Sequence, residues 1–119
     1  MESHHLDTGK RGEVIARNHL EGKGYRILDS NWRHGKTELD IVALHGSILV
    51  FVEVKTRSSS WFGEAAAFVD ERKEALIQEA AAAYMTQKNY NWEVRFDVIG
   101  VQLAANGSFE LNHYEDAFF

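Results

Sequence analysis

The spacing of apolar residues divides the chain into helical and strand-like segments. Apolar side chains recur every three or four positions in residues 8–23 and 70–88, as one face of a helix requires. The other segments are short runs rich in Val, Ile, Leu and aromatic residues, which are typical of strands. The predicted strands are residues 25–32, 38–45, 47–57, 92–101 and 108–114. This order predicts an α/β fold with an αβββαβ core, a mixed β-sheet flanked by helices, and a C-terminal β extension.

The composition is that of an ordinary globular protein. Of the 119 residues, 45% are hydrophobic and 26% charged, and we expect a single domain over residues 1–119. The absence of cysteine excludes a disulfide scaffold and a thiolate metal site, and it is typical of a reducing compartment. No run approaches the roughly 18 apolar residues of a membrane span, and the N-terminal residues lack the apolar core of a signal peptide. We therefore expect a cytoplasmic protein without membrane contact.

The second and third predicted strands form the most informative region. With Gly46 and Ser47 as a two-residue type II′ turn, the numbers of opposed residues sum to 93. One face then pairs only apolar residues: Leu39 with Val54, Ile41 with Val52, and Ala43 with Val50. The other face pairs Leu44 with Leu49, Val42 with Phe51, Asp40 with Glu53, and Glu38 with Lys55. A slip of one residue would mix the faces, so the pattern selects this register or one two residues away, and the turn favours the former.

This register places two carboxylates opposite each other, Asp40 and Glu53. Their β-carbons would lie about 4.5–5.5 Å apart, and two like charges at that distance cost about 3 kcal/mol at an effective dielectric of 20. A hard divalent cation, Mg²⁺ or Mn²⁺, would remove this repulsion. Lys55 shares the face of Glu53 and could polarise a nucleophile or neutralise a phosphoryl group. The alternative is that these charges are simply solvated at the exposed end of a hairpin.

Asp40, followed after twelve residues by Glu53-Val54-Lys55, resembles the signature of the PD-(D/E)XK nuclease superfamily, with Leu39 where a proline is usual. More narrowly, the chain resembles the YraN-like family of bacterial proteins, which is described as Holliday-junction-resolvase-like. The matching stretches are Gly9–Glu13, Gly24–Leu28, Asn31–Arg33, Glu38–Ala43, Phe51–Arg57, Arg95–Val98 and Asp116–Phe118.

The resemblance implies a restriction-endonuclease-like fold and metal-dependent hydrolysis of phosphodiester bonds in DNA. The catalytic residues would be Asp40, Glu53 and Lys55, with support from Glu13, and Asp40 and Glu53 would hold the Mg²⁺ or Mn²⁺. Branched or junction DNA is the expected substrate, and two symmetric cuts in a junction would require a homodimer. The alternative is a nucleic-acid-binding or scaffolding protein that has the nuclease fold but little catalytic activity.

Two further acidic residues each have two interpretations. Glu13 could complete the acidic cluster from the first helix, or it could pair with Arg17 one turn along that helix. Glu38 could be another metal ligand, or it could be the cross-strand partner of Lys55, which we favour.

The distribution of charge bears on DNA binding. The net charge is −5, but residues 1–57 hold nine Lys/Arg and eight Asp/Glu, whereas residues 58–119 hold four and ten. A basic patch is therefore expected in the first half of the chain. In the second half, Lys73 at the start of the second helix could reach the substrate or be a surface lysine, and we favour the latter. We also predict a structural salt bridge between Arg95 and Asp97. The candidate DNA-binding residues are Lys10, Arg11, Arg33, Lys36 and Arg57.

Overall fold

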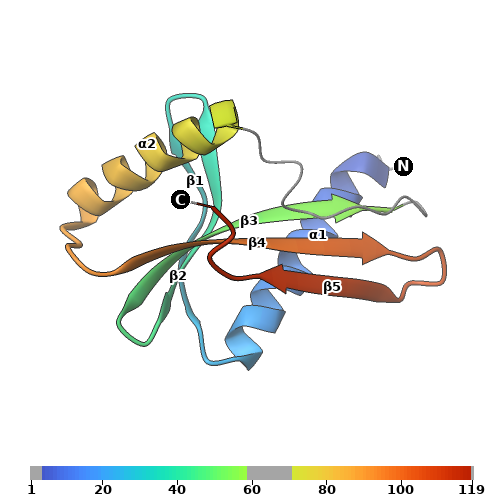
Figure 1. Ribbon diagram of the computed structural model, residues 1–119. Coiled ribbons are helices and arrows are strands. Elements are labelled where there is room, and N and C mark those ends of the chain that lie inside the picture. Colours follow the sequence, from blue (N-terminus) through green and yellow to red (C-terminus); the bar gives the residue numbers. More distant parts are fainter. Residues whose placement is uncertain (1–3, 59–70, 119) are drawn as a thin grey trace.

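The computed structural model describes residues 4–58 and 71–118, with side chains from residue 8 onward. Its elements are α1 (His4–Gly22), β1 (Arg26–His34), β2 (Thr37–His45), β3 (Ile48–Arg57), α2 (Glu71–Lys88), β4 (Val94–Leu103) and β5 (Phe109–Tyr114). The strands form one sheet in the order β1-β2-β3-β4-β5, with β3 and β4 parallel and the other neighbours antiparallel. The helices pack on opposite faces (Figure 1). The predicted mixed αβββαβ fold with its C-terminal β extension is confirmed.

The first helix differs from its predicted bounds at both ends, and the second ends at the predicted residue. α1 begins at His4 and not at residue 8, because residues 4–7 contain no glycine or proline to interrupt a helix. It ends at Gly22, and Gly24 follows in the left-handed conformation, with a φ of 89°. α2 is present from Glu71 to Lys88, and residue 70 lies outside the described residues. Neither of these two helices has the length and apolar character needed to cross a bilayer.

The register predicted for the β2–β3 hairpin is confirmed near the turn. Ile41 pairs with Val52, the following residues continue this register as far as His45 and Ile48, and Gly46 has the positive φ of 64° that the turn requires. The paired ladder ends at Ile41, however, so the predicted pairs of Asp40 with Glu53, Leu39 with Val54 and Glu38 with Lys55 do not form.

β2 and β3 separate beyond Ile41, whereas β2 continues to pair with β1 along its other edge. β1 and β2 stay paired out to His34 and Thr37, and a bulge in β1 between Ile27 and Asp29 increases the twist of this hairpin. The β1–β2 hairpin therefore bends away from β3 (Figure 1). One consequence is that Leu39 packs in the cluster beneath α2, and not on the face of Val54 as predicted.

The core consists of one apolar cluster on each face of the sheet. On the α1 side, Ala16 and Leu20 pack against strand residues that include Ile41, Val52 and Ile99. The cluster on the α2 side contains Leu39, Val42, Leu49, Phe51, Ile77, Ala80, Ala81 and Tyr84. The two helices thereby fix both faces of β3, the strand that carries Glu53 and Lys55.

A buried carboxylate ties the C-terminal segment to the sheet. Asp97 on β4 is fully buried, and Arg95 donates two hydrogen bonds of 2.8 Å to its carboxylate. His113 Nε2 lies 2.8 Å from the same carboxylate, and the backbone N–H of Asp116 donates to it at 3.0 Å. Burial alone would raise the pKa of Asp97, but the hydrogen bonds from His113 and Arg95 outweigh it and lower the pKa. The predicted Arg95–Asp97 salt bridge is confirmed as a structural one.

Candidate active site

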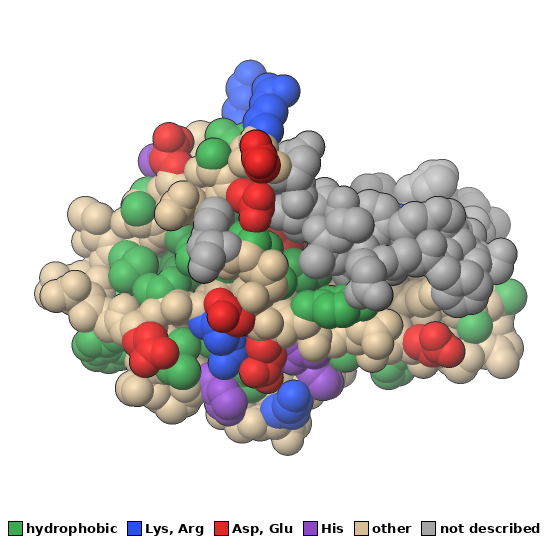
Figure 2. Space-filling model, in the orientation of Figure 1, with side chains coloured by type: hydrophobic (Ala, Val, Ile, Leu, Met, Phe, Trp, Pro, Cys, Tyr) green, Lys and Arg blue, Asp and Glu red, His purple; other side chains and the backbone are tan. Residues whose placement is uncertain are grey.

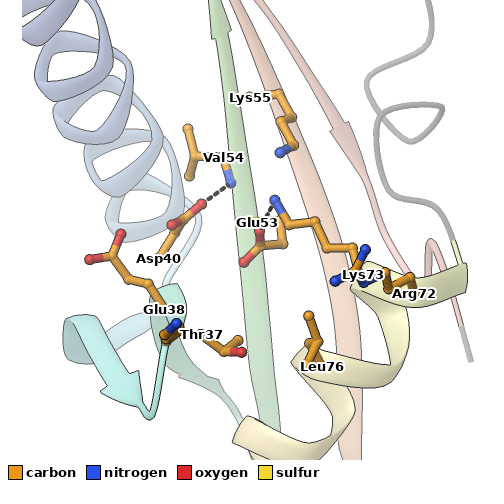
Figure 3. A pocket seen from close by; sticks show the side chains of 10 residues that line it. Thr37, Glu38, Asp40, Glu53, Val54, Lys55, Arg72, Lys73 and Leu76 are labelled. Atoms are coloured by element: carbon orange, nitrogen blue, oxygen red, sulfur yellow. Dashed lines mark hydrogen bonds and ion pairs between the residues drawn. The ribbon is translucent and has the colours of Figure 1, made fainter.

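A cleft of about 570 Å³ opens where β2 and β3 separate. Its walls are the β1–β2 hairpin, the C-terminal half of β3 and the start of α2 (Figure 3). Most of the residues that line it are acidic or basic. The lining residues are Lys36, Thr37, Glu38, Asp40, Glu53, Val54, Lys55, Arg72, Lys73 and Leu76. The structure therefore brings Asp40, Glu53 and Lys55 into one cavity.

Asp40 is held by the backbone of β3. Its Oδ2 accepts a hydrogen bond of 2.8 Å from the backbone N–H of Val54 (Figure 3), so the side chain satisfies a donor that β2 no longer reaches with its backbone. Burial raises the pKa of Asp40 to about 6. The hydrogen bond from Val54 opposes this rise, and the charges of Glu13 and Glu38 add to it. Asp40 thus keeps a fixed position at the point where the strands part.

Glu53 is almost completely buried, with 4% of its surface exposed. Burial raises the pKa of Glu53 to about 7, and the charge of Asp40 raises it further. Lys73 opposes this rise, because its Nζ lies 3.4 Å from Glu53 Oε1 (Figure 3). Two desolvated carboxylates therefore act on each other in the cleft, and each makes ionisation of the other less favourable.

Lys55 lies two residues further along β3 and is half-buried. Burial and the neighbouring Lys73 lower the pKa of Lys55 to about 8, against the opposing charge of Glu53. Lys55 can therefore donate hydrogen bonds to an anion, and it releases its proton more readily than an exposed lysine.

Glu13 approaches the cleft from α1. Its Oε2 accepts a hydrogen bond of 2.9 Å from Asn31 Nδ2, and Asn31 lies on β1 between the residues that pair with Ile41 and Leu39. Glu13 is therefore held beside Asp40, on whose pKa its charge acts. Of the two interpretations of Glu13, this placement favours the acidic cluster over a pair with Arg17.

Glu38 has a different partner from the one we favoured. Its Oε2 lies 3.3 Å from Arg33 Nη2, across the β1–β2 ladder. The pair with Lys55 does not form because β2 and β3 have already separated at this point. Glu38 remains on the rim of the cleft, and Arg33 is tied to it.

The arrangement of acidic residues and lysine on these strands can be compared with known proteins. A family model described as "Uncharacterised protein family UPF0102" matches residues 12–101. The chain belongs to the UPF0102 family. A UPF0102 protein of Flavobacterium psychrophilum is 44% identical over 115 residues, which cover 97% of this chain and 96% of the relative. Another, from Porphyromonas gingivalis, is 46% identical over 115 residues, which cover 96% of this chain and 85% of the relative.

The family is part of the PD-(D/E)XK nuclease superfamily, so the resemblance seen in the sequence is confirmed at the level of family and superfamily. A third relative, from Alkaliphilus oremlandii, is 42% identical over 113 residues, which cover 92% of this chain and 96% of the relative, and it carries the same family name.

The basic residues predicted to bind DNA are not gathered at one place in this UPF0102 protein. Lys36 lines the cleft, whereas Lys10 and Arg11 line a separate groove with Val14 and Phe109. Arg57 Nη1 donates to the backbone carbonyl of Thr56, and Arg33 is paired with Glu38. Figure 2 shows a face on which basic and acidic side chains are interspersed and form no continuous basic area.

Sequence reasoning missed Arg72 of α2 and favoured a surface position for Lys73, but both residues line the cleft. They lie in residues 58–119, whose net charge is negative, so the charge distribution gave no reason to expect cations of the site there. One signal was available for Lys73, which precedes Ile77 by four residues and so continues the buried stripe of α2. The interpretation of Lys73 as a surface lysine is wrong, because it forms an ion pair with the buried Glu53.

The donors in the cleft suit a hard divalent cation. Asp40 and Glu53 offer carboxylate oxygens, which Mg²⁺ and Mn²⁺ prefer over nitrogen or sulfur. Their desolvation and mutual repulsion would both be relieved by a bound cation. Within residues 4–58 and 71–118, no group of three or more His, Asp or Glu side chains is arranged to hold a metal ion. Water and substrate phosphate would therefore supply the remaining ligands, as is usual for Mg²⁺.

Proposed function

We propose that this UPF0102 protein hydrolyses phosphodiester bonds in DNA with the help of Mg²⁺ or Mn²⁺. The observation that carries the proposal is the convergence of two buried carboxylates, Asp40 and Glu53, with Lys55 in one cleft. An ionised pair of this kind is unfavourable unless a cation joins it. Membership of a nuclease superfamily supports the same reaction.

Each residue of the cleft has a distinct part in the proposed reaction. A divalent ion held by Asp40 and Glu53 would lower the pKa of a bound water and polarise a phosphoryl oxygen. Val54 fixes Asp40 through its backbone N–H, so that the carboxylate is oriented before substrate arrives. Lys55 would donate a hydrogen bond to a phosphate oxygen and neutralise the charge that develops there. Glu13, held by Asn31, adds negative charge beside Asp40 and so favours cation binding.

The placement of basic residues supports a localised contact with DNA. Lys36, from the β1–β2 hairpin, and Arg72, from α2, both line the cleft and could bind phosphates next to the cut. A straight duplex is normally bound through an extended basic surface. We therefore propose a flap or junction, in which one strand is accessible, as the substrate. Two symmetric cuts in a four-way junction would require a homodimer, and sedimentation on junction DNA tests this.

The experiment that tests the proposal combines Mn²⁺ calorimetry with cleavage assays on linear, flapped and four-way DNA. The parent is expected to bind Mn²⁺ and to cleave a branched substrate. Asp40→Asn should abolish both, because it removes the charge of one of two ligand carboxylates. Glu110→Gln removes an exposed carboxylate on the edge strand β5 and should behave like the parent.

The outcomes separate the two functions that the sequence left open. An unchanged Mn²⁺ isotherm in Asp40→Asn would contradict the metal site. Tight binding of Mn²⁺ and DNA without cleavage of any of the three substrates would favour the nucleic-acid-binding or scaffolding protein instead.

A further inference from the structure

Lys73 is placed in the cleft by the packing of α2. Ile77, Ala81 and Tyr84 form the buried stripe of this helix, and Lys73 continues that stripe one turn toward the N-terminus. The apolar stem of Lys73 therefore follows the core surface, and its ammonium group reaches Glu53 (Figure 3). The side chain of Lys73 is 40% exposed and that of Glu53 only 5%, so the lysine side chain extends from the solvent to the buried carboxylate.

The position of Lys73 is unfavourable for the helix itself. α2 begins at Glu71, so Arg72 and Lys73 lie in its first turn, where the partial positive charge of the helix macrodipole repels cations. Glu71 and Glu74 in the same turn offset part of this repulsion, and the ion pair of Lys73 with Glu53, at 3.4 Å, adds an attraction from the cleft.

The charges of the cleft limit how many metal ions it can take. Two-metal nuclease sites hold their ions about 3.5–4 Å apart and need carboxylates that serve both. In the described part of this chain, Asp40 and Glu53 have no third His, Asp or Glu grouped with them as a metal site. A second ion bound through Glu53 Oε1 would compete with the ammonium group of Lys73, whose Nζ lies 3.4 Å from that oxygen.

We propose that the ammonium group of Lys73 supplies at Glu53 the positive charge that a second metal ion would otherwise bring. The site then takes one divalent ion and not two. This inference rests on the proposed function, because it concerns the same two carboxylates. Lys73 acts through Glu53, so it is a positioning residue, whereas Lys55 faces the substrate.

Mn²⁺ calorimetry on the folded full chain tests the inference, with Lys88 as the matched control. Lys88 lies at the other end of the same helix stripe, is also 40% exposed, and pairs with Asp29 at 4.0 Å. The parent and Lys88→Met should each bind one Mn²⁺ with the same affinity. Lys73→Met keeps the apolar stem but removes the charge, and it should bind one Mn²⁺ roughly tenfold more tightly, because a competing cation is gone.

Two further variants complete the test. Lys73→Glu places a carboxylate where the ammonium group was, and it should bind two Mn²⁺ ions. Lys73→Arg keeps the charge and should match the parent, which separates loss of charge from any loss of folding. A parent that binds two ions, a Lys73→Glu variant that still binds one, or a Lys73→Met variant indistinguishable from Lys88→Met would overturn the inference. A parent that binds no Mn²⁺ would overturn the proposed function as well.

Discussion

The closest approach between α1 and the sheet offers a direct test of how the site is held together. Gly12 faces Thr56 on β3, and a β-carbon added at Gly12 would lie 1.8 Å from Thr56 Oγ1 and 2.7 Å from both Cβ and Cγ2. Rotation of the threonine side chain cannot relieve this overlap, because the Cβ of Thr56 does not move. In Gly12→Ala, α1 would have to retreat by roughly 0.7 Å to restore an ordinary contact of 3.4 Å.

The expected cost follows from two opposing effects. Overpacking of this kind typically costs about 1–3 kcal/mol, and replacing glycine by alanine within a helix gains up to about 1 kcal/mol. The matched control is Gly9→Ala on the same helix, because a β-carbon at Gly9 meets no atom within 4 Å. That variant should gain stability. Because the helix gain is common to both variants, their free energies of unfolding should differ by the overpacking cost alone, roughly 1–3 kcal/mol.

Urea denaturation measures this difference, and a second substitution checks its origin. Thr56→Ala removes two of the three close atoms, so it should recover part of the loss in the Gly12→Ala background. A retreat of α1 would also weaken the 2.9 Å hydrogen bond between Glu13 and Asn31, and with it the affinity for Mn²⁺. If Gly12→Ala proved as stable as Gly9→Ala, the packing of α1 on β3 would not be as tight as the structure describes.

Three further predictions concern buried charges. The folded-state pKa values of Asp40 and Glu53 are raised to about 6 and about 7. Their contribution to the free energy of unfolding should therefore be complete below about pH 4 and lost as the pH rises to 7, which urea denaturation at several pH values checks. Mg²⁺ should stabilise the protein more at pH 7.5 than at pH 5. Asp97→Asn should destabilise by on the order of 3 kcal/mol because it removes the main partner of the largely buried Arg95. Glu115→Gln, at a half-exposed partner of that arginine at 3.8 Å, should cost less than about 1 kcal/mol, and urea denaturation measures both. Lys55→Ala should retain its Mn²⁺ affinity or raise it slightly, since a charged lysine has no lone pair for a metal and its removal lessens the local positive charge. It should lose DNA cleavage; equal cleavage by parent and variant would show that Lys55 has no part in the reaction.

The parts of the fold that the sequence predicted are those governed by local periodicity. The glycine turn at Gly46 and Ser47 favoured one register for the hairpin, and the structure has that register from Ile41 to His45. The separation of the strands at Asp40 was not predictable in the same way. The bulge in β1 increases the twist of the β1–β2 hairpin, and the pattern of residues in β2 itself does not reveal that bulge.

The candidate site was predicted in part for a related reason. Asp40, Glu53 and Lys55 lie on adjacent strands, so counting residues along the hairpin was enough to bring them together. Lys73 reaches the cleft from a helix that follows residues 59–70, and no count along the chain relates that helix to β3. Only the match between the buried stripe of α2 and the apolar face of the sheet determines which end of the helix lies over Glu53.

The separation of β2 and β3 is itself what makes a metal site possible. Had the ladder continued, Asp40 and Glu53 would have been direct neighbours on one face, and no cavity would have opened between them. Because the strands part, the backbone N–H of Val54 turns to the carboxylate of Asp40, and a cleft opens with Glu53 at its base and Lys73 across it. The desolvation that raises both carboxylate pKa values has the same origin, since these groups lie where the sheet splits and not on its solvated edge. A substitution that restored pairing beyond Ile41 should therefore lower the metal affinity even if it stabilised the fold.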